Sequence, residues 1–134
     1  MKDSHVELYA HIVWTTSGCE PTITSTVQPV VYSAIEHECT KLGVALLAIG
    51  GIEDHVHILV QMPHSVMVPI LMQRAKGVSA RVANELPGGP TLLWQRGYGA
   101  FSISRWDVER VARYIANQRR HHAENTSIRI LEPA

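Results

Sequence analysis

The stretch VALLAIGGIEDHVHILVQM, residues 44–62, decides the fold of this chain of 134 residues. It contains two apolar runs, Val44 to Ile52 and His55 to Met62, and only Glu53 and Asp54 separate them. Short apolar runs rich in β-branched residues are typical of strands, and so short a connection suits neighbouring strands that run antiparallel. We therefore expect these two runs to pair side by side in one sheet.

Further elements flank this hairpin on both sides. Residues 5–16 alternate apolar and polar side chains, which predicts a half-buried strand. Helical spacing of apolar residues predicts three helices, and Ser104 with Asp107 resembles a capping box at the start of the third. The expected order is a strand at 5–16, a helix at 25–42, strands at 44–52 and 55–62, a helix at 66–86, strands at 92–96 and 100–104, and a helix that continues to about His122. This order predicts an α+β fold, a ferredoxin-like antiparallel sheet with helices packed against it.

The length and composition of the chain indicate a single domain over residues 1–134. Apolar residues make up 46% of the sequence, which is enough for one core, whereas a (β/α)8 barrel needs about 250 residues. The sequence has no apolar run of membrane-spanning length and no signal peptide pattern at its start. We expect a cytoplasmic protein with no membrane partner.

Basic residues are concentrated in the middle of the chain. The whole sequence carries 12 Lys and Arg and 12 Asp and Glu, so its formal net charge is zero. Residues 1–73 hold two basic and seven acidic side chains, whereas residues 74–122 hold nine basic and three acidic ones. Such asymmetry indicates a surface for a polyanion, although a solvated helix face with ordinary arginines explains it equally well.

The strand expected at 55–62 carries two histidines at alternate positions. Because side chains alternate across a strand, His55 and His57 project from one face and Val56 projects from the other. Two imidazoles on one face suit a metal ion, and Asp54 or Glu53 beside them can orient a ring or add an oxygen ligand. The alternative is a pair of half-exposed strand histidines without a metal. In a chain with eight histidines, the bare pattern favours that alternative.

A second polar cluster lies on the helix expected last. Tyr114 and Gln118 are four residues apart and share one face, with Arg110 before them and His121 and His122 one turn later. Taken by itself, Tyr114 is an amphipathic residue at the edge of the core, and the two histidines suit a helix C-terminus. Taken with the histidine pair of the strand, Gln118 can supply an amide oxygen as the third ligand that the pair lacks.

The same cluster offers a nucleophile. A tyrosine hydroxyl has an ordinary pKa of about 10 and attacks poorly near neutral pH. A divalent cation that polarises a phosphodiester makes the phosphorus more electrophilic, so that a phenol can attack and remain as a covalent phosphotyrosine. Because this chemistry conserves bond energy for a second transfer, it suits strand exchange better than hydrolysis.

Four motifs in this order resemble those of one family of DNA-processing enzymes. They are Asp54-His55-Val56-His57-Ile58-Leu59-Val60, Lys76-Gly77-x-Ser79, Trp94-Gln95-x-Gly97-Tyr98-Gly99-Ala100-Phe101-Ser102 and Tyr114-Ile115-x-Asn117-Gln118-x-x-His121-His122. Over residues 5–126 the chain resembles the small single-tyrosine HUH transposases of bacterial insertion sequences, with the REP-associated tyrosine transposases as near relatives. The resemblance implies the HUH nuclease fold.

The resemblance also implies a role for each motif residue. Tyr114 is the nucleophile that cleaves single-stranded DNA and keeps the 5′ phosphate, and His55, His57 and Gln118 hold Mg2+ or Mn2+. The family further implies recognition of DNA hairpins at element ends. It implies a homodimer with active sites shared between subunits, although the sequence itself permits Tyr114 to serve the histidine pair of its own chain or of its partner.

Contacts with single-stranded DNA are expected from the basic segment and from aromatic residues. Trp94, Tyr98 and Phe101 would add base stacking if exposed, but we expect Trp94 and Phe101 to lie in the core. Phosphate contacts are expected from the arginines and the lysine of the basic segment. These candidates are Arg74, Lys76, Arg81, Arg105, Arg113, Arg119 and Arg120.

Two other functions remain open at this point. A domesticated or binding-only descendant would hold hairpin DNA without cleaving it and without mobility, and a metal-dependent hydrolase would cleave without a covalent adduct. The presence of both histidines, Tyr114 and Gln118 favours a transposase over the binding-only protein. A binding module has no need of a ligand set beside a nucleophile.

Overall fold

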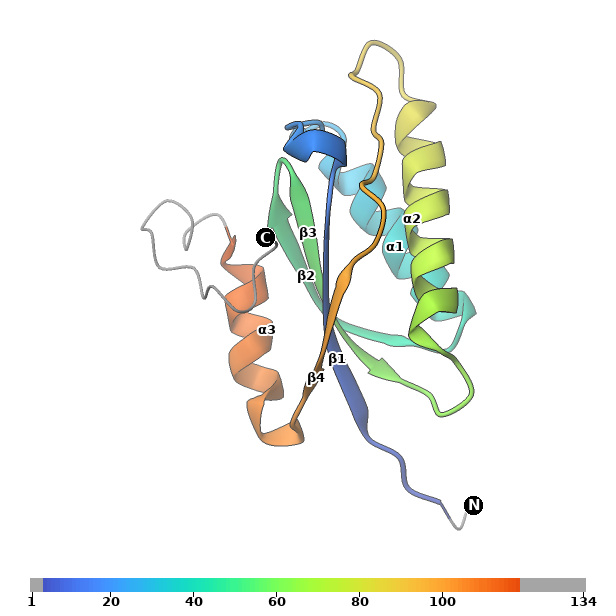
Figure 1. Cartoon of the computed structure of the whole chain (residues 1–134), viewed down its shortest axis with the longest axis vertical. Helices are drawn as coiled ribbons and strands as arrows, with labels where there is room; N and C mark the ends of the chain where they lie inside the picture. Colours follow the sequence, from blue (N-terminus) through green and yellow to red (C-terminus); the bar gives the residue numbers. More distant parts are fainter. Residues whose placement is uncertain (1–3, 119–134) are drawn as a thin grey trace.

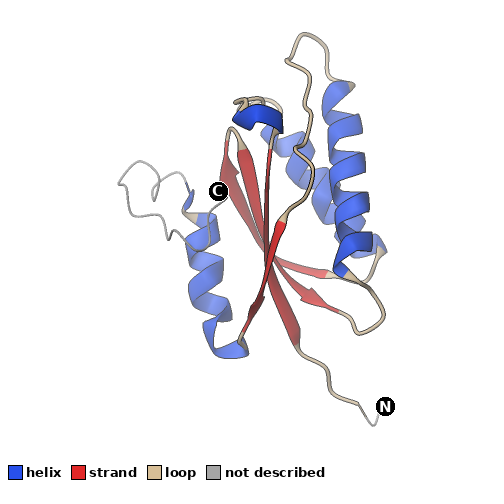
Figure 2. Cartoon of the chain, in the orientation of Figure 1, coloured by secondary structure: helices blue, strands red, loops and turns tan. Residues whose placement is uncertain are grey.

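The computed structural model describes residues 4–118, which form an α+β fold of one four-stranded antiparallel sheet and three α-helices (Figures 1 and 2). The strand order in the sheet is β2-β3-β1-β4. The strands are β1 (Leu8–Thr15), β2 (Ala45–Ile52), β3 (His55–Met62) and β4 (Gly99–Ile103), and the helices are α1 (Gln28–Lys41), α2 (Val68–Asn84) and α3 (Val108–Ala116). The predicted fold class is confirmed.

The hairpin expected from residues 44–62 forms the β2–β3 pair. The two strands run antiparallel, from Ala45 opposite Gln61 to Ile52 opposite His55. On its other side β3 pairs with β1, also antiparallel. β3 is therefore an inner strand, and it is buried at nearly every position.

Helices cover both faces of the sheet (Figure 1). The helices α1 and α2 pack on one face, where Val56 and Ile58 of β3 join the main core. The helix α3 packs on the opposite face, where Leu59 joins a smaller core. Alternate residues of β3 thus contact different helices, and the face that carries His55 and His57 lies beneath α3.

The centre of β1 differs from the half-buried strand that residues 5–16 predict. His11, Ile12, Val13 and Trp14 are all buried, although successive side chains point to opposite faces of the sheet. The reason is the double cover of the sheet, because β1 is an inner strand between β3 and β4. A polar residue on the second face, such as His11, is therefore enclosed rather than solvated.

Residues 92–96 do not form the strand that the sequence predicts. Within this segment, Trp94 makes one isolated bridge to Thr16. The Leu92 backbone bonds instead to the side chain of Asn84 at the end of α2, donating to its Oδ1 at 2.7 Å and accepting from its Nδ2 at 2.9 Å. Around the bridge, Ser17 N donates to the Leu93 oxygen at 2.7 Å and Gln95 N donates to the Thr15 oxygen at 2.9 Å, but the pairing does not extend into a strand.

The third helix begins later than predicted. Ser104 Oγ accepts a hydrogen bond from the backbone N of Trp106 at 3.2 Å, which starts a short 3-10 turn, η2 (Arg105–Asp107), ahead of α3. The predicted continuation to His122 lies outside the described residues, which end at Gln118.

The first two helices confirm the predictions for 25–42 and 66–86, each shortened by one to three residues at either end. Gly43, the second residue after the first helix, has a φ of +72°, a conformation that favours glycine at a helix end. None of the helices in the described part of the chain is long and apolar enough to cross a membrane.

Candidate active site

The two histidines of β3 lie on the sheet face covered by α3. His55 and His57 are 3% and 0% exposed. His57 is flanked in the sheet by Gly50 of β2 and Val13 of β1. This burial excludes the alternative in which the pair consists of half-exposed surface histidines.

Each histidine of the pair is oriented through its Nδ1 atom. His55 Nδ1 lies 2.7 Å from Asp54 Oδ1, so this carboxylate takes the orienting role that the sequence allowed for it. His57 Nδ1 lies 2.8 Å from His11 Nε2. The two imidazole centroids of the pair are 5.0 Å apart, with ring planes at 73°. Because Nδ1 of both rings is engaged, Nε2 is the atom through which each ring would bind a cation.

Gln118, two residues after the end of α3, meets this pair although it lies 63 positions after His55 in the sequence. Gln118 Oε1 lies 3.4 Å from His55 Nε2, and the Gln118 side chain is buried. Its Nε2 donates to the backbone oxygen of Tyr114 at 3.3 Å, which fixes the direction of the amide. Two neighbouring ligands of one octahedral cation lie about 3 Å apart, so the spacing and the donor types fit a divalent metal ion.

The donor set depends on the amide of Gln118. Among residues 4–118, no three His, Cys, Asp or Glu side chains gather into a metal-binding group. The donor atoms that the structure brings together here are two imidazole nitrogens and one amide oxygen, from the three residues expected as ligands. A cation held by so few protein ligands keeps positions for phosphate oxygens.

Tyr114 faces the histidine pair from α3. Its ring centroid lies 6.1 Å from that of His57, the ring planes meet at 87°, and the residue is 5% exposed. Tyr114 packs with Leu59, Val111 and Ile115 in the smaller core. The predicted nucleophile and the predicted ligands thus come together within one chain.

A glycine in β2 allows α3 to approach the sheet this closely. A Cβ atom at Gly50 would lie 2.0 Å from the backbone oxygen of Ile115, so a larger residue would displace the helix. Gly50 carries no signal of this role in the sequence, because a linear sequence does not reveal which helix crosses a strand glycine. The close approach positions Tyr114 and Gln118, which lie on either side of Ile115 along the chain.

His11 is a further residue at the site, and it lies outside the four motifs of the sequence. Its imidazole is fully buried, bonded to His57 and stacked on it with centroids 5.0 Å apart. The strand register contains the signal that could have found it. In β1, Val13 is opposite His57, so His11, two residues earlier, is a diagonal neighbour on the same face.

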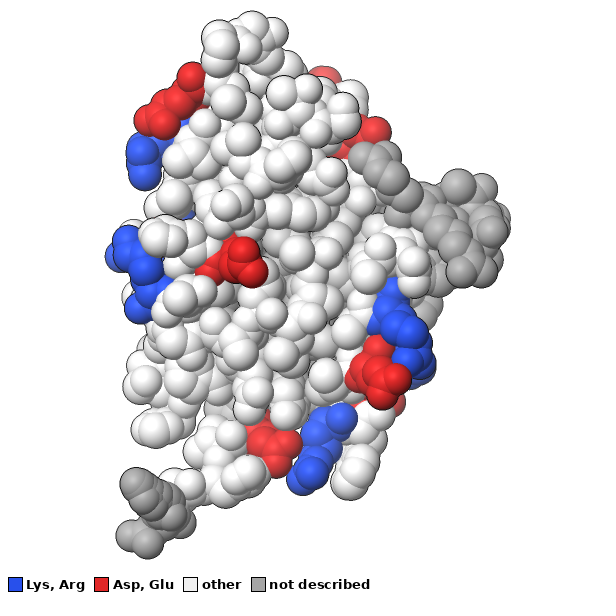
Figure 3. All heavy atoms as spheres, turned by 180° about the vertical axis from the view of Figure 1, so that it is seen from behind, with Lys and Arg blue, Asp and Glu red and all other residues white. Residues whose placement is uncertain are grey.

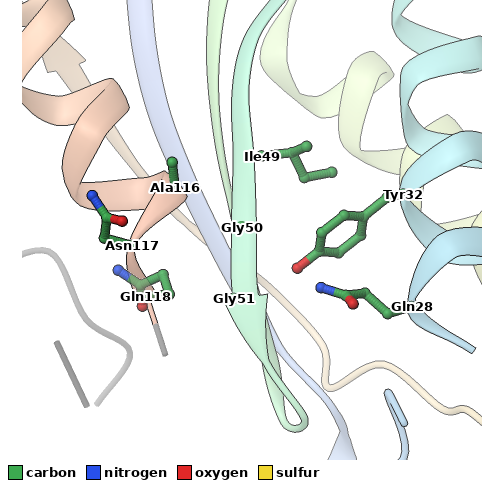
Figure 4. A pocket seen from close by; sticks show the side chains of 8 residues that line it. All are labelled: Gln28, Tyr32, Ile49, Gly50, Gly51, Ala116, Asn117 and Gln118. Atoms are coloured by element: carbon green, nitrogen blue, oxygen red, sulfur yellow. The ribbon is translucent and has the colours of Figure 1, made fainter. Parts of the chain in front are cut away.

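A cavity of about 330 Å³ lies along β2 beside Gln118 (Figure 4). Ala116 at the end of α3 and the next two residues, Asn117 and Gln118, line it on one side, and α1 contributes Gln28 and Tyr32. In Figure 4 the amide of Gln28 and the hydroxyl of Tyr32 point toward the glycine segment of β2. Polar groups from the α1 side of the sheet thus reach the margin of the site.

Comparison with known protein families decides the family of the chain. The family model described as "Transposase IS200 like" matches residues 4–118 of the chain. The chain belongs to the IS200-like transposase family. A search of curated proteins gave no match.

Two solved structures share the fold of this IS200-like transposase. One is a candidate transposase from Deinococcus radiodurans R1, with a TM-score of 0.68 and 21% identity over 94% of this chain and 98% of that one. The other is a REP-associated tyrosine transposase bound to a REP hairpin, with a TM-score of 0.68 and 12% identity over 95% of this chain and 74% of that one. These likenesses establish the expected fold.

The basic residues expected to contact DNA phosphates do not lie on one face of the transposase. Arg74, Lys76 and Arg81 belong to α2, whereas Arg105 belongs to η2 and Arg113 to α3, on the other face of the sheet. On the face seen in Figure 3, lysines and arginines occur in small separate groups beside acidic side chains. The remaining candidates, Arg119 and Arg120, lie outside the described residues.

Two of these candidates support the fold of the transposase. Arg74 Nε donates to Oε1 of the buried Glu38 at 2.9 Å. Lys76 Nζ donates to the backbone oxygens of Gln95 and Gly97 at 2.8 and 3.1 Å, and burial lowers the pKa of this ammonium group. Both side chains therefore have intramolecular partners that a phosphate would have to replace.

The aromatic candidates divide into one partly buried residue and two exposed ones. Trp94 is partly buried: it packs edge-on against Trp14 at the margin of the core and donates its Nε1 to Ser79 Oγ at 3.1 Å, but it is not a strand residue. Phe101 and Tyr98 are 36% and 39% exposed, so the expectation that Phe101 lies in the core is wrong. Phe101 is exposed because β4 is an edge strand of the sheet. Both residues line a cavity of about 370 Å³ beside β1.

Proposed function

We propose that this transposase cleaves and rejoins single-stranded DNA at the ends of its element through a covalent phosphotyrosine at Tyr114. One observation carries the proposal, namely that a tyrosine and a set of metal-ligating atoms meet in the same buried place. The Tyr114 ring lies against that of His57, and Gln118 Oε1 lies 3.4 Å from His55 Nε2. A protein that only bound DNA would have no use for this arrangement.

In this proposal His55, His57 and Gln118 hold Mg2+ or Mn2+. When bound, the cation polarises the scissile phosphate and stabilises charge on its non-bridging oxygens. The contribution of the protein is to present the three donor atoms together. Asp54 and His11 keep the two imidazoles in position through their Nδ1 atoms.

Cleavage and rejoining are two directions of one transfer at Tyr114. The phenol oxygen attacks the phosphorus and loses its proton, a new P–O bond forms to the tyrosine, and the bond to the 3′ oxygen breaks. The leaving 3′ oxygen takes up a proton and becomes a 3′ hydroxyl. When the 3′ hydroxyl of another strand attacks the phosphotyrosine, the phosphodiester is restored and Tyr114 recovers its proton.

We infer that single-stranded DNA and DNA hairpins in the cytoplasm are the substrates. The REP-associated relative is bound to a hairpin, which supports this class of ligand. Arg81, Arg105 and Arg113 are paired with Glu85, Glu7 and Glu109, but their side chains remain 64%, 57% and 64% exposed. Exposed ion pairs contribute only about 0–1 kcal/mol, so a phosphate can replace the carboxylate partner of each. Tyr98 and Phe101 would then stack on bases.

We further infer a homodimer. The edge strands β2 and β4 offer surfaces on which a second copy can pair. The contact between Tyr114 and His57 within one chain supports a complete site in each subunit. An exchange of α3 between subunits would join the same residues in shared sites, as the family resemblance implies.

The covalent adduct provides the test of the proposed function. Wild-type protein is incubated with labelled single-stranded oligonucleotides from both ends of the DNA segment that carries its gene, with Mg2+ or Mn2+, and separated on a denaturing gel. We expect a cation-dependent protein–DNA band for the wild type and no such band for Tyr114→Phe, because only the attacking oxygen is lost. Hairpin binding by Tyr114→Phe should be nearly unchanged.

Tyr98→Phe is the matched control, since it removes the hydroxyl of an exposed tyrosine and should retain the adduct. Binding without cleavage by the wild type would favour a binding-only descendant. Cleavage without an adduct would favour a hydrolase. Either outcome would overturn the proposed function.

A further inference from the structure

His11 is a third buried histidine beside the proposed ligand pair, and it comes from a different strand. It lies on β1, is 0% exposed, and has its Nε2 2.8 Å from His57 Nδ1. The two rings stack with centroids 5.0 Å apart and planes at 27°. His11 is thus a polar residue enclosed by the fold. It contacts His57, a proposed metal ligand, and not the proposed cation itself.

We propose that His11 is a positioning residue that fixes the tautomer and the ring orientation of His57, so that His57 presents Nε2 to the cation. The proposal rests on the proposed function, because it gives His57 the role of a metal ligand. It assigns His11 no contact with DNA or with the reacting phosphate.

The tautomer follows from the chemistry of imidazole. A neutral ring carries one N–H and one nitrogen with a lone pair, and a cation needs the lone pair. If Nε2 of His57 binds the cation, its proton must lie on Nδ1, where His11 Nε2 accepts it. His55 follows the same pattern, because its Nδ1 lies 2.7 Å from Asp54 Oδ1. Two different acceptors thus select the same tautomer in the two ligands.

Burial explains why one acceptor is a carboxylate and the other an imidazole. The side chain of Asp54 is 34% exposed, so water can solvate its charge. His11 is fully buried, and its ring also lies 6.3 Å from that of Phe101. An ionised carboxylate in that place would carry a large desolvation cost, whereas a neutral imidazole accepts the same hydrogen bond without charge. The stacking contact additionally restrains the plane of the His57 ring.

The test uses DNA-free protein and compares variants that keep or lose an acceptor at the Nε2 position. The His57 tautomer is measured by nitrogen-15 NMR of the imidazole in the absence of metal, and the affinity for Mn2+ is measured by titration. For His11→Leu we expect a mixture of both His57 tautomers and an affinity for Mn2+ lowered about 10- to 100-fold. His11→Gln places an amide oxygen near the position of Nε2, and it should keep both properties close to those of the wild type.

Two further variants separate positioning from packing. His11→Asn is polar but too short to reach His57 Nδ1, so it should behave like His11→Leu. It also replaces that variant if His11→Leu fails to fold. Phe101→Leu changes the packing beside His11 without removing the bond, and it should leave the tautomer and the Mn2+ affinity unchanged.

Equal tautomer populations and equal Mn2+ affinities in the glutamine and asparagine variants would overturn the proposal, because His11 would then only fill space. The test separates this failure from that of the proposed function. If His11 variants alter the His57 tautomer and Mn2+ affinity as expected but the wild type forms no adduct with DNA, the positioning role stands and the proposed transposition chemistry fails.

Discussion

A buried carboxylate joins the two helices on the face of the sheet opposite the candidate active site. Glu38 of α1 is 2% exposed, and its Oε1 accepts hydrogen bonds from Arg74 of α2 while Lys41 lies 3.7 Å from its Oε2. Burial raises the pKa of Glu38, but the hydrogen bond from Arg74 and the charges of Lys41 and Arg74 outweigh it. The pKa of the folded state therefore lies below the ordinary value.

The sign of this shift predicts the pH dependence of an Arg74 substitution. Because the pKa of Glu38 is lower in the folded than in the unfolded state, its contribution to stability is present at neutral pH and is lost as the pH falls through the folded-state pKa. Arg74→Leu should lower the free energy of unfolding by about 1–2 kcal/mol at pH 7, and by less at pH 4. Urea unfolding at both pH values measures the difference.

Arg81→Leu is the matched control on the same helix, because Arg81 pairs with Glu85 and both side chains are more than 60% exposed. It should change the free energy of unfolding by less than about 0.5 kcal/mol. Equal losses for the two arginine substitutions, or a loss for Arg74→Leu that does not shrink in acid, would contradict the role of Glu38.

At the scale of residues, the sequence predicts a site residue when its role can be inferred from its spacing to residues nearby in the chain. The alternation of His55 and His57 and the spacing of Tyr114 and Gln118 can be counted along the chain, and the structure brings all four together. The partner of His57 is not local, because His11 meets it through the register of two strands 46 positions apart in the sequence. Its position could be predicted only after the strand pairing was known.

At the scale of elements, the docking of α3 depends on the contact between Gly50 and the backbone of Ile115. We predict that Gly50→Ala displaces α3, because the added Cβ would lie 2.0 Å from the Ile115 oxygen. The free energy of unfolding should fall by about 1–3 kcal/mol, which thermal or urea unfolding measures. Adduct formation should fall more steeply than stability, because Tyr114 and Gln118 move with the helix.

Gly77→Ala is the control for a glycine substitution without a steric conflict. Gly77 lies in the interior of α2, and a Cβ there would meet nothing within 4 Å. This substitution should raise the free energy of unfolding by about 0.5–1 kcal/mol. A Gly50→Ala variant as stable and as active as the wild type would show that α3 has room to adjust.

The elements with strong periodicity form as predicted, whereas the strand expected at residues 92–96 is reduced to a single bridge. The two runs in residues 44–62 and the first two helices form as predicted. Residues 92–96 include apolar residues between turns, as a strand would, yet the backbone of Leu92 forms two hydrogen bonds with the side chain of Asn84. Periodicity does not reveal such a competing partner.

At the scale of the whole molecule, helices cover both faces of the sheet, and this is why the histidines of the candidate site are buried. The sequence predicts the α+β class because the order of elements can be counted, but it does not predict that α3 encloses the histidine pair. The expectation of half-buried strands therefore fails at His11, which is fully buried.

Mixed dimers test how the sites are assembled. A Tyr114→Phe chain is combined with a His55→Ala/His57→Ala chain, subunits are allowed to exchange, and cleavage is measured. If sites are shared, one site in each mixed dimer has an intact histidine pair and an intact Tyr114, so activity should reappear. Inactive mixed dimers, confirmed by native mass spectrometry, would mean that Tyr114 serves the histidine pair of its own chain.

The most direct test of the central claim is the chemical identity of the DNA-linked residue. Wild-type protein that has reacted with single-stranded DNA and Mn2+ is digested with a nuclease and trypsin and analysed by mass spectrometry. Trypsin releases residues 114–119, YIANQR, as a peptide with a single tyrosine. We predict that this peptide carries a nucleotide through a 5′ phosphate at Tyr114. A nucleotide on another residue, or cleaved DNA with no modified peptide, would contradict the account.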